Sequence, residues 1–178
     1  KCLPMNEIIL STKRIYSGRI VTLDLCEVEL PDGQHQMREI IRHPGAIALI
    51  ALDDQNRILL VRQFRSASAQ VMSEIPAGVL NAAEDPLNAA IRELQEETGY
   101  KPGKVEPLGG FYVAPGYTTE YIHLFFATGL IEARLTGDAD EFLVMTRLPL
   151  PEALAMIEKY RGGVVPAGSA VSVTLRLE

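Results

Sequence analysis

The segment that most constrains the fold reads EDPLNAAIRELQEETG and ends at Gly99. Asp85 can cap the first turn of a helix, Pro86 suits the first helical position, and Gly99 can end the last turn in a left-handed conformation. Apolar residues recur at the spacing i, i+3, i+4 and i+7, namely at Leu87, Ala90, Ile91 and Leu94. Because this period places them on one side of a helix, the segment predicts an amphipathic helix over residues 85–99.

Acidic residues crowd the polar flank of this helix. Glu93 and Glu97 are one turn apart and Glu96 lies beside them, so we expect their carboxylates to converge away from the apolar side. Like charges at this spacing destabilise a helix by about 0.2–0.5 kcal/mol per pair unless a cation lies between them. Hard carboxylate oxygens suit Mg²⁺ or Mn²⁺, and Mg²⁺ commonly shares its coordination with substrate phosphates. The pattern predicts a metal site for phosphate chemistry, with a solvated acidic face as the alternative.

The spacing of these residues is more informative about the protein family than their charge is. Gly78 is followed after five residues by Glu84, and after seven more by the run Arg92-Glu93-Leu94-x-Glu96-Glu97-x-Gly99. This arrangement resembles the box of the Nudix hydrolases, which cleave nucleoside diphosphates linked to another moiety. Tyr100 departs from the family pattern, which usually has a branched aliphatic residue at that position.

The resemblance implies a fold and a set of roles. The expected fold is α/β, of the α+β kind, with a mixed β-sheet sandwiched between helices and an N-terminal antiparallel strand extension. Divalent metal is expected to be held by Glu93, Glu96, Glu97 and the backbone carbonyl of Ala77 or Gly78. Arg92 is expected to orient the box carboxylates. Glu84 is expected to be structural, with direct metal ligation as the alternative.

The rest of the chain reads largely as strands. Residues 15–42 alternate between apolar and polar and break at Pro31-Asp32-Gly33, which predicts a hairpin. Two nearly continuous apolar runs within residues 46–65 predict buried strands. Two more strands are expected to flank a loop over residues 114–120, followed by a helix over residues 148–160.

This pattern divides the chain into two parts. Residues 1–43 are interpreted as an N-terminal β extension that forms a dimer, and residues 44–178 as the Nudix hydrolase domain. The tail after Gly162 is rich in β-branched residues, while its position suits a packing helix, so it fits either a strand or a helix.

Hydrolysis of a pyrophosphate also needs a base. The attacking water must be activated and the charge that develops on the phosphoryl oxygens must be neutralised, and bridging cations can contribute to both. In one branch of the Nudix hydrolases the base is a glutamate on a late loop. The only late acidic loop here reads GDADEFLV, so Glu141 is our candidate, followed by Asp140 and Glu120. A solvent-facing Glu141 is the alternative.

Further segments resemble the ADP-ribose pyrophosphatase branch of the family, and the similarity covers roughly residues 14–160. These segments are IIRHPGAIALIAL, VRQFR, EIPAG, FYVAPGYTTE and DEFLV. The resemblance implies that Arg65 pairs with diphosphate oxygens, for which a planar guanidinium is well matched, and that Glu74 lies near the nucleoside end. For either residue, a surface ion pair is the alternative.

Other substrate contacts are expected from a loop and from the N-terminal strands. Pro115 and Gly116 can turn the loop back toward the box, so that Glu120 lies beside the metals or the terminal ribose. Arg38 and Arg42 are candidates for substrate contacts across a homodimer. In this branch of the family the N-terminal strands pack on the neighbouring subunit and help to build its substrate pocket.

Three functions follow from these observations. The first is Mg²⁺-dependent hydrolysis of ADP-ribose to AMP and ribose 5-phosphate, with Mn²⁺ as another possible ion. The second keeps the chemistry with GDP-mannose or another nucleotide sugar, because Pro166-Ala167-Gly168-Ser169 stand where relatives commonly read something like DAKT. The third is a non-catalytic nucleotide-binding regulator of the same fold, which the intact box glutamates argue against.

The composition excludes some partners. The formal net charge of -6 argues against nucleic acid as the main partner, because such proteins need a basic face. No run approaches the roughly 18 apolar residues of a membrane span, and the first residues lack a signal-peptide layout. Cys2 and Cys26 have no metal-type spacing and form no disulfide framework, so we expect a reducing, cytoplasmic environment.

Overall fold

The computed structural model describes residues 5–137 and 142–160. Asp140, Glu141 and the tail after Gly162 therefore lie outside the described residues. The chain divides into two compact units, of which the first contains the chain up to Ala46 together with Gly110–Ile122. The second contains Ile47–Gly109 and the chain from His123 onward.

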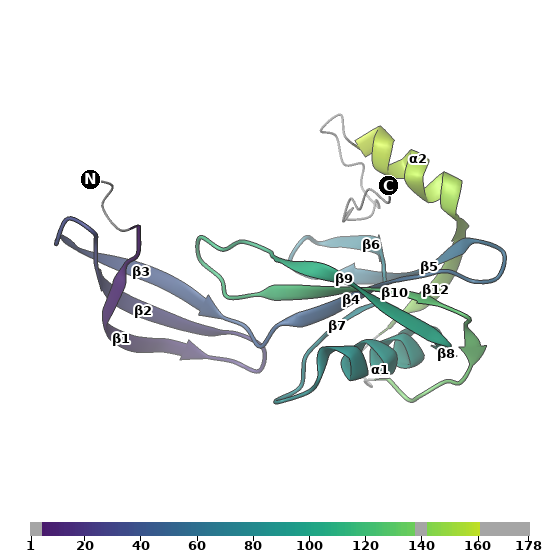
Figure 1. Ribbon diagram of the computed structural model, residues 1–178, viewed down its shortest axis with the longest axis horizontal. Coiled ribbons are helices and arrows are strands. Elements are labelled where there is room, and N and C mark those ends of the chain that lie inside the picture. The colour runs from purple at the N-terminus through teal and green to yellow at the C-terminus, as the bar shows by residue number, and fades with distance from the viewer. Residues whose placement is uncertain (1–4, 138–141, 161–178) are drawn as a thin grey trace. The chain divides into compact units, whose positions relative to one another are not determined.

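The first unit contains a three-stranded antiparallel sheet in the order β1-β2-β3 (Figure 1). Its strands are β1 (Ile8–Ser17), β2 (Thr22–Glu29) and β3 (His35–Arg42). The predicted hairpin corresponds to β2 and β3, and Gly33 in its turn has a φ of 82°, which an L side chain rarely adopts. β1 was not expected as a separate strand, because all ten of its residues are exposed and it shows no buried alternation.

The loop that follows β9 (Lys104–Tyr112) is attached to the end of β3 within the same unit. The backbone N–H of Ile41 donates to the carbonyl of Tyr117 at 2.8 Å, and Thr119 donates back to Ile41 at 3.0 Å. The hydroxyl of Thr119 also accepts from the backbone N–H of His43 at 3.0 Å. These bonds fix the backbone of a segment that sequence analysis identified only as a loop.

The remaining strands form further small sheets. The sheet orders are β7-β4-β10-β9, β11-β8 and β12-β5-β6. The bounds of these strands are β4 (Ala46–Ala51), β5 (Arg57–Arg65), β6 (Gln70–Glu74), β7 (Ala77–Val79), β8 (Tyr100–Lys101), β10 (Tyr121–Thr128), β11 (Ile131–Glu132) and β12 (Val144–Pro149).

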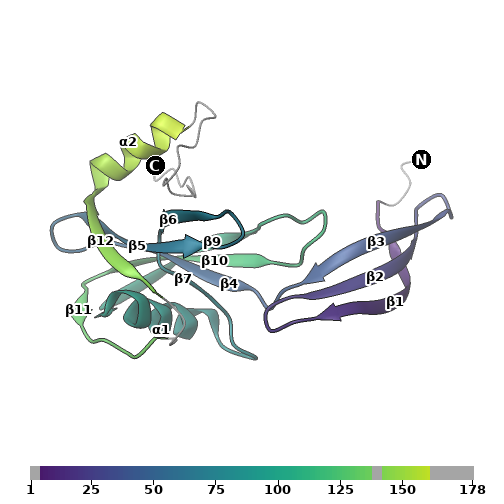
Figure 2. The same ribbon diagram turned by 180° about the vertical axis from the view of Figure 1, so that it is seen from behind.

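Two helices accompany these strands, α1 (Pro86–Thr98) and α2 (Leu150–Tyr160). Both views show strands of the second unit lying between α1 and α2 (Figures 1 and 2). This arrangement confirms the expected α+β fold with strands between helices. Neither helix in the described ranges has the length and apolar character needed to span a membrane.

The core of the second unit forms where α1 packs on β4, β5 and β10. Its buried members are Ile47, Leu49, Ala51, Leu59, Ala89, Ala90, Leu94, Phe125 and Ala127. Leu94 is fully buried, as its place in the apolar period predicts. Leu87, which the apolar period places on the same side, is 41% exposed, whereas Ala89, outside that period, is buried. The helix therefore presents small residues to the sheet, which lets the two elements approach closely.

Candidate active site

The ends of α1 are fixed by the two residues that the sequence identified as caps. The carboxylate of Asp85 accepts hydrogen bonds from the backbone N–H groups of Leu87 and Asn88, each at 3.1 Å. Gly99 has a φ of 80° and donates to the carbonyl of Gln95 at 3.0 Å. Capped ends stop the helix from fraying, so the polar side chains between them keep a defined direction.

Arg92 lies among three carboxylates on the polar flank of α1. Its Nε and Nη2 donate to the two oxygens of Glu84 at 2.8 and 2.9 Å. Its Nη1 donates to both Glu93 and Glu96, at 2.8 Å in each case. The guanidinium therefore offsets part of the negative charge of these three carboxylates.

These contacts shift the ionisation of the paired groups. Hydrogen bonding from Arg92 lowers the pKa of Glu84 to about 2, against the partly opposing effect of burial. Hydrogen bonding to Glu84, together with the charge of Glu93 and hydrogen bonds to Glu93 and Glu96, raises the pKa of Arg92 against the opposing effect of burial. Both directions mean that this pair stays ionised across the physiological pH range.

The lowered pKa of Glu84 predicts a pH-dependent stability. The folded protein holds this carboxylate ionised well below the usual value of 4.5, so its contribution is complete above that pH and is lost as the pH falls toward 2. We expect the free energy of unfolding to fall by roughly 2 kcal/mol more in the parent protein than in Glu84→Gln between pH 5 and pH 2.5. Urea unfolding at these two pH values measures the difference.

Glu106→Gln is the control for this experiment, because Glu106 is an exposed carboxylate paired with Lys104. If the parent and Glu84→Gln lose equal stability on acidification, the pairing with Arg92 does not hold Glu84 ionised.

Ala77 and Gly78 pack directly against the box carboxylates. Glu97 is only 6% exposed, and its Oε2 accepts a hydrogen bond from the backbone N–H of Ala77 at 3.0 Å. A Cβ atom placed on Gly78 would lie 2.0 Å from Cδ of Glu93. The glycine at this position therefore leaves the space that the carboxylate of Glu93 occupies.

The donor atoms fit a hard divalent cation, although their present arrangement is not a finished metal site. Among the described side chains, those of residues 5–137 and 142–155, no three from His, Cys, Asp or Glu are already grouped as ligands of one ion. The predicted ligands Glu93, Glu96 and Glu97 offer carboxylate oxygens on one helix, which are the donors that Mg²⁺ and Mn²⁺ prefer. The side chains of Glu93 and Glu96 remain 13% and 22% exposed, so an entering ion can compete with Arg92 for them. The ligand set stays a prediction.

The two residues expected at the diphosphate and the nucleoside contact each other. Arg65 on β5 donates from Nε to Glu74 on β6 at 3.0 Å, and its Nη2 lies 2.9 Å from the same carboxylate. Gln63 donates to Glu74 at 3.1 Å as well. Arg65 remains 45% exposed while Glu74 is 16% exposed, so the carboxylate holds a guanidinium that still reaches solvent. The substrate roles of both residues stay predictions.

The other expected substrate residues belong to the first unit. Arg38 is paired with Glu7, and Arg42 is paired with Asp24. Pro115 lies in the loop attached to β3, and Glu120 at its end donates its backbone N–H to the hydroxyl of Thr118 at 3.1 Å. The structure brings these loop residues to the end of β3, and their contact with substrate stays a prediction.

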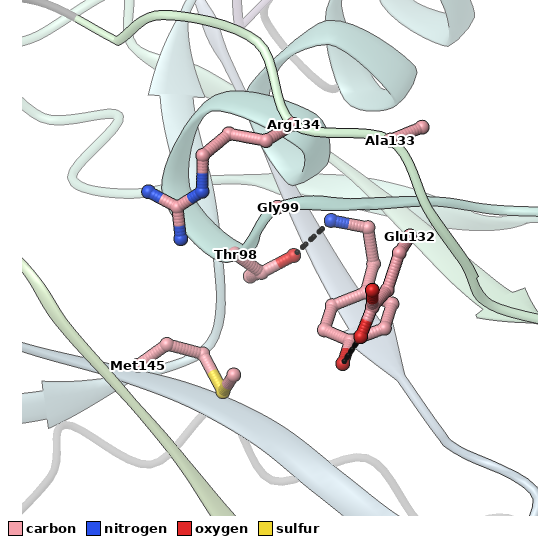
Figure 3. Close-up of a pocket in the computed structure, with 7 residues that line it drawn as sticks. Thr98, Gly99, Glu132, Ala133, Arg134 and Met145 are labelled. Atoms are coloured by element: carbon pink, nitrogen blue, oxygen red, sulfur yellow. Dashed lines mark hydrogen bonds between the residues drawn. The ribbon is translucent and has the colours of Figure 1, made fainter.

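Tyr100, the departure from the family pattern, lies beside a pocket at the C-terminal end of α1 (Figure 3). The pocket measures about 390 Å³ and is lined by Thr98, Gly99, Tyr100, Glu132, Ala133, Arg134 and Met145. The Tyr100 hydroxyl accepts a hydrogen bond from Arg147 and lies 3.4 Å from an oxygen of Glu132. An aliphatic residue could make neither contact, so the tyrosine joins β8 to β11 and β12 through polar groups.

The residue that sequence reasoning missed is Asp24. It is a charged residue at 2% exposure, and it contacts both Arg14 and Arg42. The sequence contains a signal for its burial, because Asp24 alternates in step with Cys26 and Val28 and so points to the same buried face of β2. An acidic residue in an apolar alternation requires a cationic partner, and strand register supplies two.

Comparison with known proteins gives consistent results. The model of the NUDIX domain matches residues 41–167. The methanol dehydrogenase activator of Bacillus methanolicus is 45% identical over 88% of this chain and 85% of its own. The ADP-ribose pyrophosphatase of Bacillus subtilis (strain 168) is 39% identical over 86% of this chain and 84% of its own. A crystal structure described as an ADP compounds hydrolase shares the fold, with a TM-score of 0.77 and 24% identity over 89% of this chain and 85% of that one.

Proposed function

Because this chain belongs to the NUDIX domain family, we propose that it hydrolyses the pyrophosphate bond of ADP-ribose to AMP and ribose 5-phosphate. The observation that carries this proposal is the arrangement on α1, where Glu93, Glu96 and Glu97 lie within two turns. Gly78 leaves room for the carboxylate of Glu93, and Arg92 donates hydrogen bonds to Glu93 and Glu96 and offsets part of their charge. Similarity to an ADP-ribose pyrophosphatase over most of both chains supports the choice of substrate.

We propose that Glu93, Glu96, Glu97 and the carbonyl of Ala77 hold Mg²⁺ or Mn²⁺. When bound, such ions activate water and neutralise the charge that develops on the phosphoryl oxygens. The protein contributes the fixed orientation of these ligands. Glu97 is positioned by its hydrogen bond from Ala77, and Arg92 is positioned by both oxygens of Glu84.

The substrate is bound and cleaved by residues around this centre. Arg65, held by Glu74, presents a guanidinium that suits the diphosphate oxygens. In the reaction, the water oxygen bonds to one phosphorus and the bond from that phosphorus to the bridging oxygen breaks. We propose Glu141 as the base that takes the water proton, with Asp140 and Glu120 as the next candidates.

Product analysis tests the proposed reaction and substrate together. Purified protein is incubated with ADP-ribose or GDP-mannose at equal concentration, with Mg²⁺ and then with excess chelator. We expect AMP and ribose 5-phosphate in equal amounts, a higher kcat/KM for ADP-ribose, and no turnover with chelator. A clear preference for GDP-mannose would replace the substrate and keep the chemistry, whereas turnover in chelator would contradict the role of metal.

Regulation of another enzyme is a second candidate function. The observation in its favour is the 45% identity with the methanol dehydrogenase activator of Bacillus methanolicus. A module that only binds its ligand has no need of a complete set of metal-ligating glutamates, and here Glu93, Glu96 and Glu97 are all present. We therefore place hydrolysis first. Binding of ADP-ribose without any product, in the presence of Mg²⁺, would reverse this order.

We further propose that the protein is a cytoplasmic homodimer formed through residues 1–43. The first strands expose many large apolar side chains, which include Ile8, Ile9, Leu10, Ile15 and Tyr16. Burying such a surface against a second copy removes it from water. Light scattering that gives the mass of one chain would contradict the dimer, and cell fractionation would test the location, which the free thiol of Cys26 supports.

A further inference from the structure

Asp24 holds two arginines next to each other on one face of the N-terminal sheet. Its Oδ1 accepts from Nε of Arg14 on β1 at 3.0 Å, and its Oδ2 accepts from Nε of Arg42 on β3 at 3.1 Å. The carboxylate side chain is 4% exposed, whereas Arg14 and Arg42 are 60% and 40% exposed. The two contacts, led by the Arg14 hydrogen bond, lower the pKa of Asp24, so the carboxylate remains ionised. Two guanidiniums therefore converge on one buried anion and face solvent.

A third arginine on the same face, Arg38, uses all three of its nitrogens in hydrogen bonds to protein acceptors. Arg38 uses Nε and Nη2 for the two oxygens of Glu7 and donates Nη1 to the carbonyl of Met37. Arg14 and Arg42 instead share a single carboxylate, and each contributes only its Nε. Within the described part of the chain, no hydrogen bond joins their terminal Nη groups to a protein acceptor. One carboxylate cannot accept two hydrogen bonds from each of two guanidiniums. The Nη–H groups of Arg14 and Arg42 therefore remain available to another acceptor.

The charges around Arg14 and Arg42 favour the binding of an anion. Arg14 faces Asp24 directly across the strands, and Arg42 lies on the same face of β3 as the partner of Asp24, Ile40. The other acidic residues of β2 and β3 fall on the opposite face by alternation: Glu27, Glu29 and Glu39. Two positive charges against one negative charge leave a local surplus of one, on a chain whose net charge is -6.

We propose that Arg14 and Arg42, oriented by Asp24, form a binding site for a phosphate group. A tetrahedral phosphate presents several acceptor oxygens, which suits two planar guanidiniums whose Nη groups are free. Arg42 also borders the loop fixed to β3 through His43 and Thr119. The phosphate could come from the diphosphate of a nucleotide or from inorganic phosphate, and the chemistry of recognition is the same.

Titration with inorganic phosphate tests the site without turnover. The full chain is kept in chelator at constant ionic strength, and the arginine Nε–H resonances are followed by NMR. We expect saturable shifts for Arg14 and Arg42, no shift for Arg57, which is paired with Asp53 in the second unit, and no comparable shift with chloride. The absence of saturable shifts at Arg14 and Arg42 would overturn the proposal.

Variants identify which side chains bind. We expect Arg14→Gln and Arg42→Gln each to weaken phosphate binding by about 10-fold or more, because each removes a charge-assisted donor pair. Arg57→Gln is the control, because Arg57 is paired with Asp53 in the second unit, and it should leave the affinity unchanged. Equal affinity in Arg14→Gln and the parent would overturn the site. These variants retain Asp24 with one arginine, and circular dichroism shows whether the sheet is intact.

The orienting role of Asp24 can be tested because it predicts a change in phosphate affinity opposite to the change that net charge alone predicts. If only net charge mattered, Asp24→Asn would bind phosphate more tightly, since it removes a negative charge. We expect weaker binding, because the amide offers a single acceptor oxygen and releases one guanidinium. Tighter binding would overturn the orienting role.

A second titration identifies the source of the phosphate. ADP-ribose that competes with inorganic phosphate at these resonances identifies a nucleotide diphosphate, and phosphate binding without competition identifies a separate ionic site. Because metal and turnover are absent, failure here leaves the proposed hydrolysis standing, and failure of hydrolysis leaves this site standing.

Discussion

Glu97→Gln is expected to reduce turnover of ADP-ribose by on the order of 10³-fold while leaving the fold intact. Glutamine has nearly the same shape, and its carbonyl oxygen can still accept the hydrogen bond from the backbone N–H of Ala77. What the variant loses is the negative charge of a side chain that is only 6% exposed. A neutral amide is a poor ligand for a divalent ion, so metal affinity and turnover should fall together. Initial rates over a range of Mg²⁺ concentrations measure both.

The same substitution at an exposed carboxylate is the control. Glu106→Gln removes a charge from a residue that pairs with Lys104 on the surface, and its rate should match the parent. Unchanged turnover in Glu97→Gln would remove this residue from the active site. Loss of thermal stability by several degrees in Glu97→Gln would instead indicate a structural role.

Gly78→Ala is expected to weaken Mg²⁺ binding and turnover by about 10- to 100-fold, with little loss of stability. The new Cβ would lie 2.0 Å from Cδ of Glu93 and 2.1 Å from its Oε1, so the carboxylate must leave its place. The displaced atoms belong to the far end of a flexible side chain, and the backbone can therefore stay where it is. Calorimetric titration with Mg²⁺ and a thermal melt separate the two effects.

Gly137→Ala is the matched control for this variant. A Cβ there would lie 3.7 Å or more from the atoms of Glu96, which is also on α1, and this is ordinary van der Waals contact. We expect its metal affinity to equal that of the parent. If Gly78→Ala binds Mg²⁺ as tightly as Gly137→Ala, the position of Glu93 does not matter for the metal.

Local signals made α1 predictable from sequence. Its cap residues, its apolar period and the spacing of its glutamates all lie within one short segment, and the structure places the helix between Asp85 and Gly99 as expected. The exception was Leu87, because a period identifies one side of a helix and cannot tell where along that side the sheet ends.

Long-range pairing explains what sequence reasoning did not find. The contacts between Arg65 and Glu74 and between Arg14 and Asp24 depend on the register of neighbouring strands, which the hydrophobic pattern fixes only after the strands pair. Strand β1 escaped detection for a related reason, since an entirely exposed strand carries no pattern of burial. The partnership of Arg92 with Glu84 similarly joins a helix to a residue in the preceding loop.

Arg92 belongs to the chain, whereas a metal ion must arrive by diffusion. The glutamates of α1 consequently have a counter-charge from the moment the helix forms during synthesis. If turnover depends on Mg²⁺ as proposed, a cell depleted of magnesium would lose the activity and still retain the folded protein. When the ion returns, activity would resume on the timescale of ion binding, with no refolding step.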